Sequence, residues 1–540
     1  MRTADESAPE AGGRFHVLRQ DLLASIVVFL VALPLCMGIA IASGVPIEKA
    51  AATGIITGIV AGLVVGPLAG CPLQVSGPAA GLAVIVGQLI EEHGFTTLGP
   101  IVMVAGAVQL SAGLLRLGQW FRAVSPSVIR GMLTGIGILI FAAQFHVMVD
   151  DEPPGTGVKF GGVINLYTIP RAVWKGLTEE VHQDAASIGL LTILAIMGWA
   201  SFAPKGLKFF PAPLFGALVA TTAAGLLRLD LRYITIPDNL TEAITLPVVA
   251  DWRKLLDWVI LAEGLALAFV ASAESLLTAT AADTLQQHAP RTKYDRELAA
   301  QGIGNLVCGF LGVLPMTGVI VRTSTNIQAG ARTRASTILH GLWLLIFTVL
   351  FPDVLRLVPV ASLAAILVYT GWKLINPKAV RELWQFGIGE VAIYAATLAT
   401  VVIIDLLTGI VVGIGLALAQ LVYRFSHLTI RVKEVPQQQR TELYLEGAAT
   451  FLRLPKLAAV LQDIPPSTEL HVHIEDLLHI DHACLDLLMN REKQHRAAGG
   501  SLVIDWRRLT NKSQEFGKTD RGAGPGNLAA GPGAEASSAP

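Results

Sequence analysis

The stretch GVLPMTGVIVRTSTNIQAGART, residues 312–333, places an arginine, Arg322, among apolar, small and hydroxyl-bearing residues. Pro315 and Gly318 interrupt the run at its start, so a helix that begins there exposes its first backbone N–H groups. Those N–H groups and the helix dipole attract anions, and Arg322, about one turn further in, adds a full positive charge. The stretch predicts a site for a small oxyanion or halide. The alternatives are an arginine that snorkels to an interface or one that pairs structurally with a carboxylate.

A second interrupted stretch, GCPLQVSGPAAG, carries Pro72, Gly77 and Pro78 in the other half of the chain. Interrupted segments at corresponding positions of two halves are typical of inverted-repeat transporters, because freed backbone groups are tolerated only beside a cavity. Gln74, Ser76 and Gly77 then lie on the segment that mirrors the one with Arg322. We expect two opposed helix N-termini to hold one anion between them, although Ser76 by itself is more consistent with a helix cap than with a ligand.

Glu263 and Glu274 lie in the stretch LLDWVILAEGLALAFVASAESLLTATAAD. Their separation of eleven residues is close to three helical turns, so both carboxyl groups lie on one side of the helix. Such a stripe in an apolar helix is typical of a proton or cation path. Glu274 is the deeper of the two, and a structural ion pair with Arg322 is its alternative role. Hydroxyl groups flank Glu274, at Ser272, Ser275 and Thr278.

The composition places these residues in a membrane. Of 540 residues, 53% are hydrophobic and 15% are charged, against roughly 25% in a soluble protein. The net charge of −1 provides no basic surplus for nucleic acid, and four scattered cysteines indicate neither a disulfide framework nor a metal site. Apolar segments of membrane-spanning length recur about fourteen times, at 22–43, 50–69, 77–90, 99–115, 124–148, 186–202, 211–227, 257–282, 299–314, 316–331, 335–351, 357–373, 387–404 and 406–424.

The chain divides into four regions of different composition. Residues 1–20 are polar, residues 21–426 hold the spanning segments, and Lys and Arg in the short loops predict cytoplasmic N- and C-termini for a multi-pass protein of the plasma membrane. Between Asp150 and Asp184 we expect a long mixed connection. Residues 427–511 alternate like strands and helices and predict a small α/β domain, whereas 512–540 are rich in Gly, Ala, Ser and Pro and predict disorder.

From about residue 15 to 511 the chain resembles the sulfate permease (SulP) family of anion transporters with a C-terminal STAS domain. The resemblance is carried by DLLASIVVFLVALPLCMGIAIASGVP, QVSGPAAG, DRELAAQGIGNLVCGF and TGVIVRTSTNIQAGART. It implies fourteen segments in two inverted repeats of seven, with a gate domain that moves against a core domain. It also implies an anion held between Ser76 and Gly77 on one side and Gly318, Val319 and Ile320 on the other, with Arg322 at the family's basic position.

The same resemblance implies the coupling group. Sodium-coupled bicarbonate members carry an aspartate, followed by a threonine like Thr278, where this chain has Glu274, so we expect coupling to protons or exchange of anions. The first and third segments resemble a bacterial subgroup linked with carbonic anhydrases, which favours bicarbonate over sulfate. In the soluble domain, Asp481, His482, Ala483, Cys484 and Leu485 replace the usual loop with a phosphorylatable serine. A role in packing or in a homodimer is therefore the simpler expectation.

We therefore expect a secondary active transporter of a small inorganic anion, bicarbonate or sulfate, in a lipid bilayer, without a cofactor. A passive anion channel would use the same charged residues, and saturation or dependence on a counter-gradient distinguishes the two. A nucleobase or dicarboxylate carrier of the same inverted-repeat fold is a third possibility. An enzyme is not expected, because no nucleophile with a base and no metal cluster lies in the spanning segments.

Overall fold

The structure is a computed structural model. It describes residues 11–119, 125–156, 158, 160–204, 207, 210–237, 239–246, 253, 255, 257–286, 289–435, 440–465, 467–475 and 477–505. The chain divides into two compact units, Met1–Gly415 and Leu416–Pro540. Residues 1–10 lie outside the described residues. The tail at 512–540, for which the sequence predicts disorder, also lies outside them.

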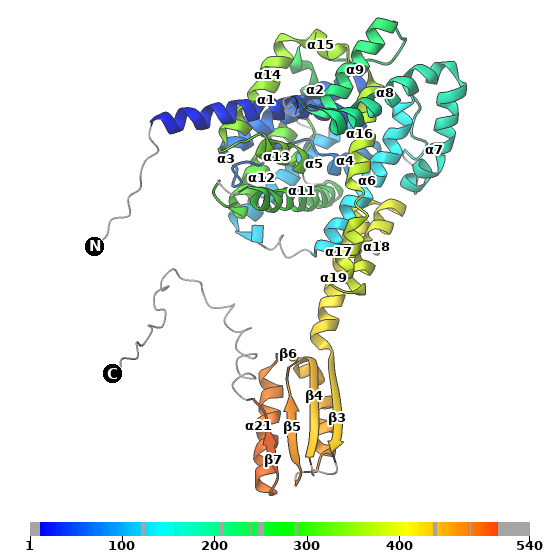
Figure 1. Cartoon of the computed structure of the whole chain (residues 1–540). Helices are drawn as coiled ribbons and strands as arrows, with labels where there is room; N and C mark the ends of the chain where they lie inside the picture. Colours follow the sequence, from blue (N-terminus) through cyan, green and yellow to red (C-terminus); the bar gives the residue numbers. More distant parts are fainter. Residues whose placement is uncertain are drawn as a thin grey trace, which may run out of the picture. The chain divides into compact units, whose positions relative to one another are not determined.

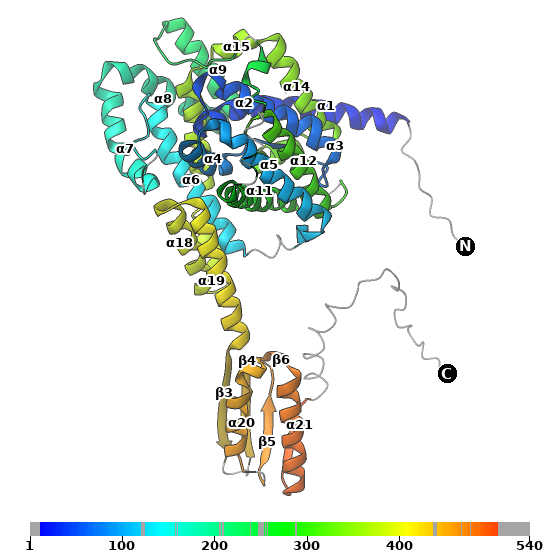
Figure 2. The same cartoon turned by 180° about the vertical axis from the view of Figure 1, so that it is seen from behind.

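Each of the fourteen predicted segments contains a helix (Figures 1 and 2). The first seven correspond to α1 (Ala11–Ala42), α2 (Ile47–Val60) with its π-helical and α3 (Gly66–Leu68) continuation, α4 (Ala80–His93), α5 (Phe95–Leu114), α6 (Pro126–Met148), α8 (Glu180–Phe202) and α9 (Ala212–Leu227). The second seven correspond to α11 (Trp258–Leu285), α12 (Tyr294–Leu311), α13 (Ile320–Gln328), α14 (Ala335–Leu350), α16 (Val360–Leu374), α18 (Ile388–Ile403) and α19 (Leu406–Ser426). The prediction of a polytopic helical fold is confirmed.

Not every segment is a long apolar helix. Within the described residues, seven helices are long and apolar enough to cross a membrane, and three shorter apolar helices accompany them. The other four segments are α4, α12, α13 and α16. Of these, α4 and α13 are short because each begins only after an interruption of the chain, and α12 carries polar side chains along its length. Helices of this kind are tolerated in a membrane where the protein itself surrounds them.

The helices pack in two groups. In one group α5 packs against α11 and α12, and α1 packs against α2 and α14; in the other, α6 packs against α16 and α18, and α8 against α9. Both views show α6–α8 on one side and α11–α14 on the other (Figures 1 and 2). The contact between α5 and α12 is close, since a Cβ at Gly302 would lie 2.3 Å from the Leu110 nitrogen. Small residues of this kind let membrane helices approach backbone to backbone.

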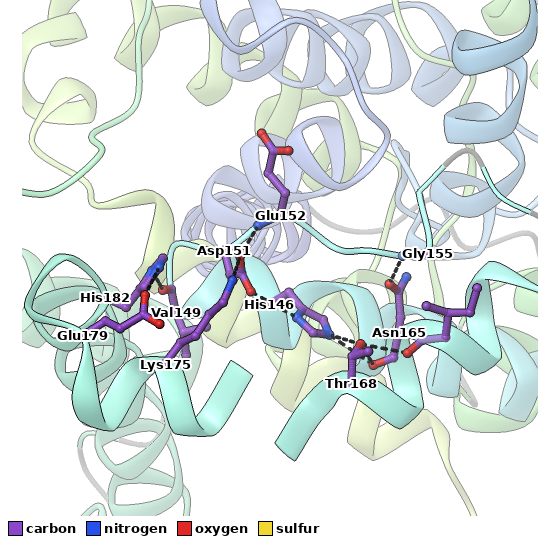
Figure 3. A network of polar contacts seen from close by, with 11 residues as sticks. His146, Val149, Asp151, Glu152, Gly155, Asn165, Thr168, Lys175, Glu179 and His182 are labelled. Carbon is purple, nitrogen blue, oxygen red and sulfur yellow. Dashed lines mark hydrogen bonds and ion pairs between the residues drawn. The ribbon is translucent and has the colours of Figure 1, made fainter. Parts of the chain in front are cut away.

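The connection between Asp150 and Asp184 differs from the expected loop, because it contains α7 (Gly161–Thr178). The loop after α6 is tied to α7 by polar contacts (Figure 3): the Nε2 atom of His146 lies 3.1 Å from Asn165 O, and Lys175 Nζ lies 2.8 Å from Asp151 Oδ1. A search for uniformly apolar runs misses α7, since polar residues and Pro170 alternate with its exposed apolar side chains. Those include Tyr167, Trp174 and Leu177.

The second unit contains a five-stranded sheet. Its strands are β3 (Leu428–Val435), β4 (Arg440–Ala449), β5 (Glu469–His473), β6 (Leu477–Ile480) and β7 (Ser501–Val503). β3 and β4 are antiparallel, whereas β4 pairs in parallel with β5 and β6, and β5 with β7. The helices α20 (Leu454–Asp463) and α21 (His482–Ala497) contribute Leu457 and Leu488 to a core with Leu443 and Leu470. The expected C-terminal α/β region is confirmed.

Candidate anion-binding site

The two interrupted segments meet in a short antiparallel bridge. Strand β1 (Ser76–Gly77) pairs with β2 (Thr317–Gly318), with Ser76 opposite Gly318 and Gly77 opposite Thr317. The Val319 nitrogen adds a hydrogen bond of 2.9 Å to Val75 O. Helix α4 begins three residues after β1, and α13 begins two residues after β2, so two helix N-termini start at one crossing.

Neither α4 nor α13 has a side chain that caps its N-terminus. The N-cap residues are Ala79 for α4 and Val319 for α13, and neither makes a side-chain capping hydrogen bond. Capping side chains such as Ser, Thr, Asp or Asn normally satisfy the first N–H groups of a helix. Two uncapped N-termini with the positive ends of their dipoles at one crossing form a favourable environment for an anion.

Arg322 lies in the first turn of α13 and is 0% exposed. Its Nη2 atom donates a hydrogen bond of 3.3 Å to Pro78 O, whereas Nε and Nη1 have no hydrogen-bond partner among the described residues. The guanidinium group lies directly against Gly77, where a Cβ would be 2.2 Å from Nη1. Arg322 therefore does not snorkel to an interface, and it holds two buried nitrogens, Nε and Nη1, whose N–H groups could donate hydrogen bonds to a bound anion.

Glu274 approaches the same crossing from α11. Both of its carboxyl oxygens lie against Gly81 in the first turn of α4, where a Cβ would be 2.8 Å from each of them. The Thr317 hydroxyl interacts with this carboxyl group, but the buried Oε2 atom has no hydrogen-bond partner in the described part of the chain. The structure contains no ion pair between Glu274 and Arg322 within the described residues, so the structural pair considered from the sequence is not formed.

The other predicted residues hold the crossing together. Thr278 donates to Gly318 O at 3.0 Å, and Ser275, one turn earlier on α11, accepts from Gly318 N at 3.1 Å. The Gln74 side chain packs so close to Gly318 that a Cβ there would lie 2.0 Å from its Nε2 atom. Ser76 accepts a hydrogen bond of 2.6 Å from Gln301. The structure thus brings together every residue predicted for the site.

The walls of the site differ in exposure and polarity. Ile320 is 43% exposed and therefore faces accessible space at the start of α13. The buried thiol of Cys36 on α1 lies near the guanidinium group of Arg322. Pro34, two residues before Cys36, lies inside α1. His340 is 1% exposed, and its Nε2 atom has no partner among the described residues.

Three functional candidates on α12 were not predicted from the sequence: Glu297, Gln301 and Asn305. All three are 0% exposed, and all three hydrogen-bond to the chain around the crossing. A signal was available, because polar residues recur at every fourth position of DRELAAQGIGNLVCGF and so lie on one helix face.

One group of metal-ligating side chains lies together in the described part of the chain. Glu92, His93 and Glu263 each place a ligand atom within 4.8 Å of the others. The group lies at the C-terminal end of α4, about 16 Å along α11 from Glu274 at 1.5 Å per residue. Exposed acidic groups of this kind are common without a metal. The predicted binding residues themselves offer N–H and hydroxyl groups suited to an anion.

Comparison with known proteins gives a consistent result. The Sulfate permease family matches residues 18–397. The chain is 28% identical over 527 residues to YvdB of Bacillus subtilis (strain 168), which is provisionally named a sulfate transporter. The aligned region covers 91% of this chain and 92% of YvdB. It is also 28% identical over 372 residues to the bicarbonate transporter BicA of Synechocystis, covering 66% of this chain and 62% of BicA.

Solved structures agree with this assignment. The transmembrane domain of a cyanobacterial bicarbonate transporter BicA superposes with a TM-score of 0.60 at 25% identity, over 74% of this chain and 98% of that domain. The structure of SLC26A9 shares the fold, with a TM-score of 0.68 at 14% identity over 93% of this chain and 87% of that one. The chain belongs to the Sulfate permease family and is a multi-pass membrane transporter of an inorganic anion.

Proposed function

We propose that this protein carries sulfate or bicarbonate across the membrane by alternating access, with the anion bound where β1 and β2 cross. The single observation that supports this site best is Arg322, a fully buried cation with two guanidinium nitrogens that have no partner among the described residues. A buried charge without an ionic partner is costly, so a protein retains one where a ligand completes its interactions. We call the proposed binding residues the anion seat: Gln74, Ser76, Gly77, Gly318, Val319, Ile320 and Arg322.

Glu274 is the proposed coupling group, with Thr278 as its neighbour on α11. The Glu274 carboxyl group lies at the same end of α4 as the seat, and one of its oxygens has no partner in the described residues. A carboxylate beside a bound anion is repelled by it, and protonation of Glu274 removes that repulsion. Uptake of a proton together with the anion, or exchange for a second anion, is proposed in place of sodium coupling because Glu274 stands where the sodium-coupled members that the chain resembles carry an aspartate.

The choice between the two anions depends on relatives. BicA is named a bicarbonate transporter and YvdB is provisionally named for sulfate, so similarity alone supports both substrates. Helix N-termini and one arginine can bind either oxyanion. If bicarbonate is the substrate, a carbonic anhydrase that interconverts bicarbonate and carbon dioxide is the matching functional partner.

The C-terminal α/β unit is proposed to be a STAS domain, about residues 427–511, following a membrane domain at 21–426. Its parallel pairs β4–β5 and β5–β7 with α20 and α21 support this assignment. Asp481 caps α21 by accepting a hydrogen bond of 2.8 Å from Cys484 N, at the loop where a phosphorylatable serine is absent. We propose a homodimer in the plasma membrane, with both termini in the cytoplasm and this unit serving assembly.

Uptake of labelled sulfate and labelled bicarbonate into proteoliposomes tests the proposal. The full-length protein is reconstituted, and proton, sodium and anion gradients are imposed one at a time. Saturable uptake driven by a proton gradient or by a counter-anion supports the transporter. Uptake that does not saturate and follows only the membrane potential indicates a channel instead. Uptake of uracil or succinate, with neither inorganic anion transported, would move the assignment to an organic-substrate carrier.

A further inference from the structure

Helix α12 carries a buried polar face that the proposed transport mechanism does not use. Glu297, Gln301 and Asn305 follow one another at intervals of four residues and therefore lie on one side of the helix. Each of them is 0% exposed. Buried polar side chains in a membrane domain are expensive unless their hydrogen bonds are made, so the partners of these three residues indicate their role.

Glu297 accepts four hydrogen bonds. Its Oε2 atom accepts from the backbone nitrogens of Gly70 and Cys71, each at 2.8 Å. Its Oε1 atom accepts from the side-chain nitrogens of Gln74 at 2.9 Å and Gln301 at 2.8 Å. Both oxygens are thus occupied: three of the four donors lie on the chain that leads into β1, and the fourth is Gln301 on α12 itself. Glu297 fixes this segment and does not itself face the anion.

Gln301 and Asn305 likewise fix the chain at the crossing, Gln301 at β1 and Asn305 just before β2. Gln301 donates at 2.6 Å to Ser76 in β1. Asn305 accepts from Met316 N at 2.8 Å and donates to Met316 O at 3.0 Å, immediately before β2. One face of α12 therefore holds the segments that enter β1 and β2, although these come from opposite halves of the chain.

We propose that Glu297 is a positioning residue that sets the anion affinity of the seat by holding residues 70–77 against β2. The proposal rests on the proposed transport function. The link to the seat is steric: Gly77 lies so close to Arg322 that a Cβ there would be 2.2 Å from Nη1, so a small displacement of β1 moves the wall against which the guanidinium group rests. Sub-ångström placement of donors is sufficient to change binding strongly.

The test is Glu297→Gln in the full-length protein. The amide replaces one acceptor oxygen with an NH₂ group that faces existing N–H donors, while size is nearly unchanged. The KM for the transported anion should rise about tenfold or more, as expected for the loss of hydrogen bonds to a charged group, with Vmax per folded protein retained. The matched control is Asp295→Asn on the same helix. Asp295 accepts from Gly118 N at 2.9 Å, away from the crossing, so its KM should stay unchanged.

Hydrogen–deuterium exchange gives a second readout that needs no substrate. Peptides covering 70–79 and 314–321 should exchange faster in Glu297→Gln than in the wild type and in Asp295→Asn. A wild-type KM together with wild-type exchange overturns the proposal, and so does a lowered Vmax with unchanged KM, because that pattern indicates a merely structural role. If the wild type transports neither anion, the proposed function fails, and exchange alone decides the positioning role.

A second pair of variants keeps the question answerable if Glu297→Gln fails to fold. Gln301→Ala and Ser76→Ala remove the same hydrogen bond from its two ends. If Gln301 acts on the seat through Ser76, the double variant raises KM no more than the larger single change. Increases in KM that multiply in the double variant would show that Gln301 does not act through Ser76 and would contradict the chain of contacts from Glu297 to the seat.

Discussion

Replacement of Arg322 by methionine separates a binding arginine from a structural one. Arg322 is 0% exposed, its Nη2 atom donates to Pro78 O at 3.3 Å, and its Nε and Nη1 atoms have no hydrogen-bond partner in the described structure. A structural arginine stabilises the fold through its contacts. A binding arginine with open donors destabilises the anion-free fold, and this free-energy cost is offset only when an anion binds.

The magnitude follows from the two open guanidinium nitrogens, Nε and Nη1, each taken to donate one hydrogen bond to the anion. A hydrogen bond that involves a charged group contributes about 1.5–3 kcal/mol, so an anion that accepts both should lose about 3–6 kcal/mol in Arg322→Met. Since each 1.4 kcal/mol is about tenfold in affinity, binding should weaken at least roughly a hundredfold. In the anion-free protein each unsatisfied buried donor costs about 1–3 kcal/mol. Methionine removes that cost at similar length, so unfolding without anion should be unchanged or shifted to higher temperature.

Thermal unfolding of the purified protein measures both effects, with and without sulfate or bicarbonate. A ligand at a hundred times its Kd stabilises the native state by about 2.7 kcal/mol, so the wild type should unfold at higher temperature when the anion is present. Arg322→Met should show no such shift and little uptake in proteoliposomes. The matched control is Arg296→Met, because Arg296 is exposed and also donates to one carbonyl, Leu68 O at 2.8 Å.

Two outcomes would refute the reasoning about Arg322. An Arg322→Met protein that still gains stability from the anion, or takes it up at a near-normal rate, would show that the guanidinium group does not bind it. A large loss of stability without anion would show that Arg322 is held by stabilising interactions, and its open N–H groups would then not indicate a binding site. Equal loss of uptake in Arg296→Met would indicate a general effect of removing positive charge.

Glu274→Gln should remove the response of anion uptake to an imposed proton gradient; an unchanged response in proteoliposomes would exclude Glu274 as the proton acceptor. Truncation after Arg424 should lower the amount of assembled protein or the uptake rate, because the C-terminal unit is proposed to serve assembly. A changed preference between sulfate and bicarbonate would contradict this role of the C-terminal unit. Burial raises the pKa of Asp151, but the hydrogen bond and charge of Lys175 outweigh burial and leave that pKa lowered. A carboxyl group with a lowered pKa stabilises the fold above its unfolded pKa, and the contribution is lost as the pH falls through the folded value. Lys175→Met should therefore reduce stability by no more than about 1 kcal/mol at pH 7 and by less at pH 3, and thermal unfolding with equal losses at the two pH values would count against this ion pair.

The sequence was sufficient for the segment order because the bilayer imposes a strong constraint. A spanning helix needs about twenty apolar residues, and interruptions such as Pro72 and Pro315 are visible in runs that are otherwise apolar. The position of Arg322 beside an interruption was also apparent, since a single charge stands out in such a run. Helix α7 was not found, because its exposed apolar side chains alternate with polar ones and Pro170 lies within it.

The partners of the polar residues could not be predicted from the sequence. Glu297 hydrogen-bonds to Gly70, 227 positions away, and Asn326 donates to Leu73 O, 253 positions away. Periodicity indicates which side of a helix a residue occupies but not which distant segment lies opposite. For the same reason the carboxyl group of Glu274 was considered as a partner of Arg322, whereas the structure places it against the first turn of α4.

The polar side chains at the crossing differ in how many of their hydrogen bonds are made by the chain itself, and Gln74 and Gln301 each keep one amide oxygen without a partner in the described residues. Glu297, Asn305 and Thr278 have their hydrogen bonds made by the chain itself, so a ligand has little to add to them. Arg322 and Glu274 keep buried polar atoms without partners in the described structure, one as donors and one as an acceptor. A donor and an acceptor left open at the ends of α13 and α4 match an anion and a proton. In the proposed mechanism, Arg322 would bind the anion and Glu274 the proton, while the chain's own hydrogen bonds at Glu297, Asn305 and Thr278 hold the crossing together.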